Sequence, residues 1–284
     1  MAIRKLDSES TTGRKSVAMR SDPTRIDPNK LKLGKHTARH DPRTLLLATY
    51  ATPTLPPPPP SLDLTTKVKG EWGMMDNDQI GDCTCAAAGH FMMEWTSRAK
   101  PKMFTPSDKQ IVAAYSAIIG YNPTTGANDN GAVELDVLNY WRQQGIAGHK
   151  ITAFVALEPA NQTHVMDAVW IFGGCYIGVQ LPNSAKPQTA NHQPWSVPPQ
   201  GATGEGAPGS WGGHAIPVLA YDARGVTVIT WGATQLMTWG FWNTYCDEAY
   251  AIISPDFLEQ KAGQPVTPDG FNMQQLQADL ADVK

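Results

Sequence analysis

The chain has 284 residues, a formal net charge of −3 at pH 7, and 41% hydrophobic against 17% charged residues. This composition supports a packed core and excludes a wholly disordered chain, and the slightly negative charge excludes strong overall affinity for nucleic acid. The charge is uneven, because residues 1–50 carry 11 Lys and Arg against 5 Asp and Glu. A basic N-terminal arm therefore precedes an acidic body.

The sequence contains no membrane or export signal. No stretch approaches the roughly 18 apolar residues of a membrane-spanning helix, and no apolar segment follows the first charges as in a secretory signal peptide. We therefore expect no membrane partner and a place in the cytoplasm or packaged in a virion. Cys83, Cys85, Cys175 and Cys246 are too few for a disulfide scaffold, so free thiols are expected.

Residues 1–65 are predicted to form a basic, proline-rich, extended arm. The five consecutive prolines of residues 56–60 cannot join a helix or a central strand and favour a stiff polyproline II rod. Such an arm is a candidate for docking on a protein partner or for covering a site on the body. Its positive charges lack interleaved aromatic residues, so we expect no specific nucleic-acid binding.

The body, residues 66–258, changes character along its length. Helical periodicity predicts helices over residues 82–95, 106–119, 132–144 and 161–170, and β-branched runs predict strands over residues 175–181, 214–221, 226–231 and 249–253. Residues 182–213 are predicted to be a long loop. This order favours an α+β fold with a mainly helical lobe, residues 66–160, and a mainly β lobe, residues 161–258. Residues 259–284 are expected to be a tail that can hold a short helix.

One cysteine and one histidine fit the nucleophilic chemistry that free thiols suggest. Cys83 lies where the Ala-rich helix is predicted to begin, and unpaired N–H groups at a helix N-terminus favour the reactive thiolate. His214 enters a predicted strand from a glycine-rich loop, so it can face that helix across a cleft. A Cys–His pair is the minimum for an activated thiol nucleophile.

Several motifs around this pair, in the same order along the chain, resemble those of the papain-like cysteine peptidases, in particular a bacterial and phage branch. The resemblance covers about residues 70–255 and rests on these segments: Ile80-Gly81-Asp82-Cys83-Thr84, Asn130-Gly131, residues 173–179, His214-Ala215-Ile216 and Trp231-Gly232. It implies a two-lobed papain-like fold, with a helical left lobe and a twisted antiparallel sheet or barrel as the right lobe. It also implies a peptide or protein substrate and no cofactor or metal.

The resemblance also implies roles for individual residues. Cys83 would be the nucleophile, His214 the base, and Asn77, six residues before Cys83, the oxyanion donor in place of the family's Gln. Gln79 lies six residues before Cys85, so Cys85 with Gln79 is an alternative nucleophile and donor. The partner that orients the histidine aligns with Ile229, and a shift of one residue brings in Thr230 instead.

Gly131 and Trp231 are expected to bind substrate. We therefore expect a cysteine peptidase or a related thiol acyl-transfer enzyme that attacks a peptide or isopeptide bond. The alternative is a catalytically degenerate papain-fold protein that serves as a structural or binding part of an assembly such as a phage particle, docked by its arm.

Overall fold

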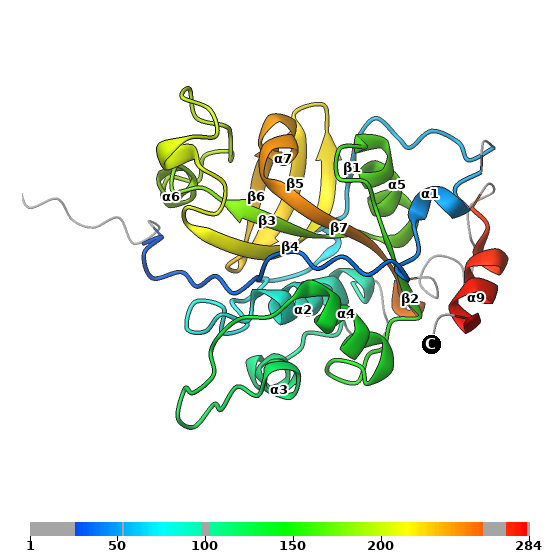
Figure 1. The fold of residues 1–284 in the computed structure, drawn as a ribbon, viewed down its shortest axis with the longest axis horizontal. Coiled ribbons are helices and arrows are strands. Elements are labelled where there is room, and N and C mark those ends of the chain that lie inside the picture. The colour runs from blue at the N-terminus through cyan, green and yellow to red at the C-terminus, as the bar shows by residue number, and fades with distance from the viewer. Residues whose placement is uncertain (1–25, 53, 98–102, 258–270, 283–284) are drawn as a thin grey trace, which may run out of the picture.

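The structure is a computed structural model, and it describes residues 26–52, 54–97, 103–257 and 271–282. An antiparallel sheet with helices on both faces forms its centre (Figure 1). The strand order is β2-β7-β3-β4-β5-β6, and β1 pairs with β4 beside this path. The strands are β1 (Leu62–Asp63), β2 (Ala153–Ala156), β3 (Cys175–Leu181), β4 (Gly212–Asp222), β5 (Gly225–Thr230), β6 (Ala233–Thr238) and β7 (Cys246–Ile253).

The helices agree closely with the four that periodicity predicts in the body. They are α1 (Leu47–Tyr50), α2 (Cys83–Trp95), α3 (Asp108–Ile119), α4 (Glu134–Gln143), α5 (Gln162–Phe172), α6 (Ala185–Ala190), α7 (Trp239–Tyr245) and α9 (Met273–Asp282), with 3-10 turns η1 (Thr65–Lys67) and η2 (Gly204–Gly206). The prediction of an uninterrupted loop over residues 182–213 was wrong, because α6 and η2 lie within it. Within the described chain, no helix has the length and apolar character needed to cross a bilayer.

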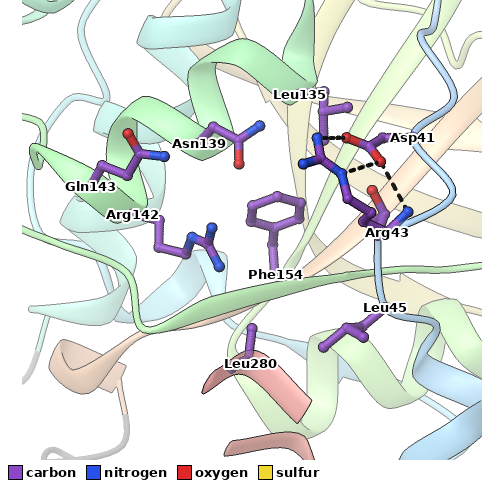
Figure 2. A pocket seen from close by; sticks show the side chains of 10 residues that line it. Asp41, Arg43, Leu45, Leu135, Asn139, Arg142, Gln143, Phe154 and Leu280 are labelled. Carbon is purple, nitrogen blue, oxygen red and sulfur yellow. Dashed lines mark hydrogen bonds and ion pairs between the residues drawn. The ribbon is translucent and has the colours of Figure 1, made fainter. Parts of the chain in front are cut away.

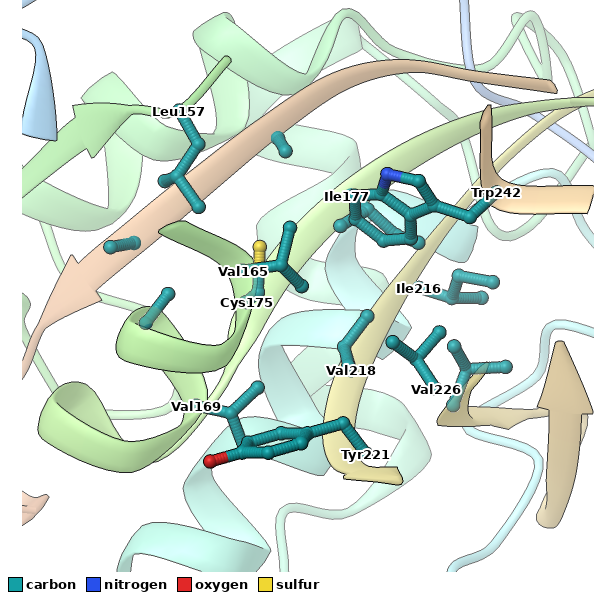
Figure 3. Close-up of a cluster of buried hydrophobic side chains, with 14 of the residues drawn as sticks. Leu157, Val165, Val169, Cys175, Ile177, Ile216, Val218, Tyr221, Val226 and Trp242 are labelled. Carbon is teal, nitrogen blue, oxygen red and sulfur yellow. The ribbon is translucent and has the colours of Figure 1, made fainter. Parts of the chain in front are cut away.

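The two faces of the sheet bury different cores because successive side chains of a strand point to opposite sides. In β3, Cys175, Ile177 and Val179 belong to the core under α5 and α7, whereas Tyr176 belongs to the core around α2, α3 and α4. Figure 3 shows the first of these cores, in which Val165 of α5 lies close to Cys175.

Helix α2 lies against the sheet along its whole length, and all of its residues are buried. Burial on every side explains why its apolar residues show no single stripe, as expected for a helix inside a core. Its first residue, Cys83, consequently starts inside the protein, next to strand β4. This packing places the thiol between the helical core and the sheet.

The described part of the arm lies against the body. Figure 1 shows its first residues, in dark blue, passing between the sheet and helices α2 and α4. Further along, the Tyr50 hydroxyl donates to Asp279 of α9 at 2.8 Å, and the amide of Asn272 donates to the Tyr50 carbonyl at 2.9 Å. The arm is therefore held both at the centre of the molecule and by the C-terminal helix.

Candidate active site

Cys83 and His214 line the same small cavity between α2 and β4. Each side chain is about 1% exposed, and the cavity measures about 10 Å³, the space that one water molecule needs. The structure therefore brings the thiol and the imidazole to one cavity, on two elements that meet. The other lining residues are Asn77, Ala86, Ala87, His90, Ala215, Ile216, Ile229, Thr230 and Trp231.

The His214 ring is held in one orientation by two neighbours. Its Nε2 lies 2.7 Å from Thr230 Oγ1, and its plane stacks on Trp231 with 4.4 Å between centroids and 12° between planes. Ile229 also lines the cavity but offers no polar atom. His214 Nδ1 is buried and has no hydrogen-bond partner in the described part of the chain. With the proton on Nε2, the ring donates to Thr230 and leaves Nδ1 free to accept a proton.

Burial keeps both reactive groups neutral in this state. It raises the pKa of the Cys83 thiol to about 12, against the opposing effect of hydrogen bonds from the backbone of Ala215 and Gly34. Burial and, to a smaller extent, the nearby His90 together lower the pKa of His214 to about 3. A thiolate–imidazolium pair would therefore form only where solvent or substrate replaces the residues that now cover the thiol and the imidazole.

Asp82, directly before Cys83, is completely buried, and its carboxyl makes no capping bond to the helix. Burial raises its pKa well above the usual range, which favours the protonated form. The charged form of Asp82 raises the pKa of the Cys83 thiol and so opposes a thiolate. A reactive thiol next to Asp82 is therefore favoured by the protonated carboxyl.

Asn77 supplies a polar group to the same cavity. Its side chain is 3% exposed, and Nδ2 donates one hydrogen bond to the Ile80 carbonyl at 3.2 Å. An amide nitrogen carries two hydrogens, so a second donor remains. The Cys83 amide lies at the helix N-terminus, where the first N–H groups have no partner within the helix.

The alternative pair does not meet at this cavity. Cys85 is buried in the core, outside the set of residues that line the cavity. The Gln79 side chain is exposed and donates to Asp78 at 2.6 Å. The structure therefore separates Cys85 and Gln79 and brings Cys83 and Asn77 together. In the part of the chain that the structure describes, no group of three His, Cys, Asp or Glu is placed to hold a metal.

Residues 31–36 of the arm cover the cavity, in a manner that the sequence did not reveal. The Gly34 carbonyl accepts from the Ala132 amide at 2.7 Å, and the His36 amide donates to the Ala132 carbonyl at 2.9 Å. On the other side, the Lys35 amide donates to the Gly213 carbonyl at 3.1 Å. The segment thus pairs through its backbone with both walls, as a bound peptide would.

The two predicted substrate-binding residues both contact this segment. Trp231 Nε1 donates to the Lys32 carbonyl at 3.1 Å. A Cβ on Gly131, whose φ is +78°, would lie 2.1 Å from the Gly34 carbonyl oxygen. A Cβ on Gly34 itself would lie 1.7 Å from the Gly81 carbonyl oxygen. Backbone therefore packs directly on backbone where the arm crosses the site.

Lys35 and its carboxylate neighbours, of which Glu134 and Glu248 are buried, were not predicted from the sequence. The Lys35 ammonium lies 2.8 Å from Glu248 and 3.0 Å from Asp247, and its side chain is fully buried. A signal was present in α4, because Glu134 falls on the same stripe as Leu138 and Trp141, where an apolar residue would be expected. No local signal in the arm indicated which lysine would be buried.

A larger cavity, about 210 Å³, lies elsewhere, between the arm, α4, β2 and α9 (Figure 2). Phe154 lies at its centre, with Arg142 of α4 on one side and the Arg43–Asp41 ion pair on the other. Neither Cys83 nor His214 lines it. Cys83 and His214 thus lie in the smaller of these two cavities.

Solved structures of known proteins identify the fold of this chain. A scan against models of protein families found no match, and a search of curated protein sequences found none. Among solved structures, xylellain, a cysteine protease from Xylella fastidiosa, is similar with a TM-score of 0.59 at 16% identity, over 79% of this chain and 97% of that one. Digestive procathepsin L 3 of Tenebrio molitor is similar with a TM-score of 0.51 at 11% identity, over 80% and 77%.

Both neighbours support the architecture expected from the motifs, in which helices pack on an antiparallel sheet. The assignment to a bacterial or phage branch stays a prediction. The chain has the papain-like fold of the cysteine proteases.

Proposed function

We propose that this protein is a cysteine peptidase, or a related thiol acyl-transfer enzyme, with Cys83 as nucleophile and His214 as base. The observation that carries the proposal is the cavity that these two residues share. It is lined by a thiol at a helix N-terminus and by a histidine that contacts Thr230 through Nε2 and has an unpaired Nδ1. The similarity of the fold to cysteine proteases is consistent with this assignment.

The first half of the reaction follows from the geometry. His214 Nδ1 accepts the proton of the Cys83 thiol, and the sulfur attacks the carbonyl carbon of a peptide or isopeptide bond. The Cys83 amide and the second N–H of Asn77 donate to the oxyanion, and losing one such donor typically costs about 10²–10³ in rate. Thr230 keeps the proton of His214 on Nε2, which leaves Nδ1 available.

In the second half, the His214 imidazolium donates its proton to the leaving amine as the C–N bond breaks, which leaves a thioester on Cys83. Water then attacks the thioester carbonyl and gives a proton to His214. The C–S bond breaks, the acid departs, and the thiol is restored. Trp231, stacked on the imidazole, shields the ring through both halves.

In this proposal, the structure corresponds to a closed state of the site. Residues 31–36 occupy the path that a substrate carbonyl would take to Cys83, and burial beneath them keeps the thiol and imidazole neutral. Activity therefore requires the arm to leave the cleft. We propose that the arm acts in cis as a cover for the site.

The test uses the full chain and displaces the arm by introducing a steric clash. Gly34→Ala places a Cβ against the Gly81 carbonyl, whereas Gly240→Ala in α7 meets only an ordinary contact 4.0 Å away and serves as the matched control. Iodoacetamide at pH 6, followed by mass mapping, should label Cys83 selectively in Gly34→Ala and far more slowly in the wild type and in Gly240→Ala. Casein should be cleaved in the same order, and His214→Ala in the Gly34→Ala background should lose both signals.

Two outcomes would contradict the proposal in different ways. Labelling of Cys83 no faster than that of free cysteine would exclude an activated thiol. Selective labelling without cleavage of casein or of an unfolded protein mixture would favour the degenerate, binding protein over the peptidase. Circular dichroism of each variant ensures that folded protein is compared.

A further inference from the structure

The Lys35 side chain occupies a pocket of unusual chemistry beside the candidate active site. Its ammonium pairs with the carboxyl groups of Asp247 and Glu248 on β7, and it also interacts electrostatically with the carboxyl group of Glu134 on α4. Glu134 is completely buried, and neither of its carboxyl oxygens has a hydrogen-bond partner in the described part of the chain. The pocket therefore holds more acidic groups than the one lysine can pair with.

The shape of the pocket also suits a long cationic side chain. Gly178 of β3 forms part of its wall, and a Cβ at this position would lie 1.8 Å from Lys35 Cε and 2.7 Å from Lys35 Nζ. Only the absence of a side chain at Gly178 leaves room for the lysine stem. A hydrogen bond from Lys35 Nζ to the His36 carbonyl at 3.1 Å completes the shell around the ammonium.

The electrostatics favour a cation strongly at this point. Burial alone would lower the pKa of Lys35, but the charges of Glu134, Glu248 and Asp247 outweigh it and raise the pKa to about 12. Removal of the lysine would leave buried acidic groups with no cation among them, which is costly unless they bind protons or another cation. An open cleft would therefore contain a vacant, acidic pocket one residue away from the position that Gly34 occupies over Cys83.

We propose that this pocket is a specificity site for a lysine or arginine side chain of a peptide bound in place of the arm, with Lys35 as its occupant in the closed state. This inference rests on the proposed function for its catalytic meaning, but binding itself needs no catalysis. The backbone of the incoming peptide would use the hydrogen bonds of Ala132 and Gly213 that the arm now uses. Its basic side chain would take the place of Lys35 between Gly178 and the carboxyl groups.

The experiment measures binding in a full chain that cannot cleave. The variant Gly34→Ala with Cys83→Ala has its arm displaced and no nucleophile. The probe is a fluorescein-labelled heptapeptide with the sequence of residues 31–37, compared by fluorescence polarisation with a peptide in which norleucine replaces the lysine at the position of Lys35. We expect the lysine peptide to bind at least about tenfold more tightly, because a buried charge pair is lost with norleucine.

Two further variants locate the preference in the pocket. Glu248→Gln should reduce the preference for lysine, whereas Glu158→Gln, at an exposed position after β2, should leave it unchanged. Gly178→Ala should abolish binding of the lysine peptide by filling the space for its stem. Equal affinities of the two peptides, or a preference that persists in Glu248→Gln and Gly178→Ala, would overturn the proposal.

The two peptides are also compared in the double variant Lys35→Ala with Cys83→Ala, which empties the pocket without a steric clash in the arm. This second background keeps the test valid if the variant Gly34→Ala with Cys83→Ala misfolds. Lack of binding, or lack of a lysine preference, in both backgrounds overturns the proposal. A clear preference without casein cleavage in the variants with Cys83 intact would retain the pocket and reject the peptidase. Cleavage of casein without any preference for the lysine peptide would retain the peptidase and reject the pocket.

Discussion

At the scale of single residues, the site depends on how one imidazole is oriented. His214 has one nitrogen on Thr230 and the other unpaired, and its face is covered by Trp231. A threonine hydroxyl can both accept and donate, so it fixes the tautomer less firmly than an acceptor-only group would. In the proposed mechanism, Thr230 is a positioning residue, since it acts through its contact with the histidine.

Replacing Thr230 therefore tests the orientation of the His214 ring separately from the role of His214 as a base. In the Gly34→Ala background, Thr230→Val keeps the shape but removes the hydroxyl, and we expect the rate of Cys83 alkylation at pH 6 to fall by about ten- to a hundredfold. Thr230→Ser restores the hydroxyl and should recover most of the rate. Equal rates in all three proteins would show that Thr230 does not orient the base.

At the scale of elements, helix α2 connects the Cys83 thiol to the core. Phe91, two turns after Cys83, is completely buried and lies among Trp95, Trp141 and Tyr176, with ring centroids 5.0 to 6.4 Å apart. These rings come from α2, α4 and β3, so they join the helical side of the molecule to the sheet. The position of Cys83 therefore depends on packing well away from the thiol.

Phe91→Ala should lower the free energy of unfolding by about 3–5 kcal/mol, because the cavity is enclosed by three elements and cannot collapse easily. Urea denaturation followed by tryptophan fluorescence measures this change. Lys109→Ala, on an exposed turn of α3, is the comparison and should change stability by less than about 0.5 kcal/mol. A small effect at Phe91 would mean that the aromatic cluster does not hold α2 in place.

At the scale of the whole molecule, the buried histidine couples folding to pH. The folded pKa of His214, about 3, lies below the ordinary value of 6.5 in the unfolded chain. Between these values the unfolded chain binds a proton that the folded chain does not. The contribution of His214 to stability is therefore fully present above about pH 6.5 and is lost as the pH falls towards 3.

Comparison of the wild type with His214→Gln isolates this contribution, because His90 and the buried carboxyl groups are common to both proteins. Between pH 6 and 4.5, we expect the wild type to lose about 1.4 kcal/mol more per pH unit than the variant. Urea denaturation at several pH values gives both curves. Parallel curves would show that His214 can be protonated without opening the site.

Much of this architecture could be predicted from local patterns, and the remainder depends on contacts distant in sequence. Strand β3 was predicted with its observed bounds because its apolar residues are bounded by Gly174 and Pro182, and α2 to within one residue because apolar residues fill it. Strand β2 has only four residues, β6 mixes Gln and Met among its threonines, and α7 contains Gly240, so none of the three showed a clear period. The pairing of Lys35 with Glu248 spans most of the chain and leaves no local trace.

The contact of glycine on glycine beneath the arm has a practical consequence. Gly34 lies against Gly81 and Gly131, and the Lys35 carbonyl lies against Gly213, so the track accepts main chain only. A synthetic inhibitor that follows this track must carry glycine, or another unit without a Cβ, at the position of Gly34. Its potency would then come from the neighbouring basic group, and peptides with a side chain at the position of Gly34 would be excluded by shape alone.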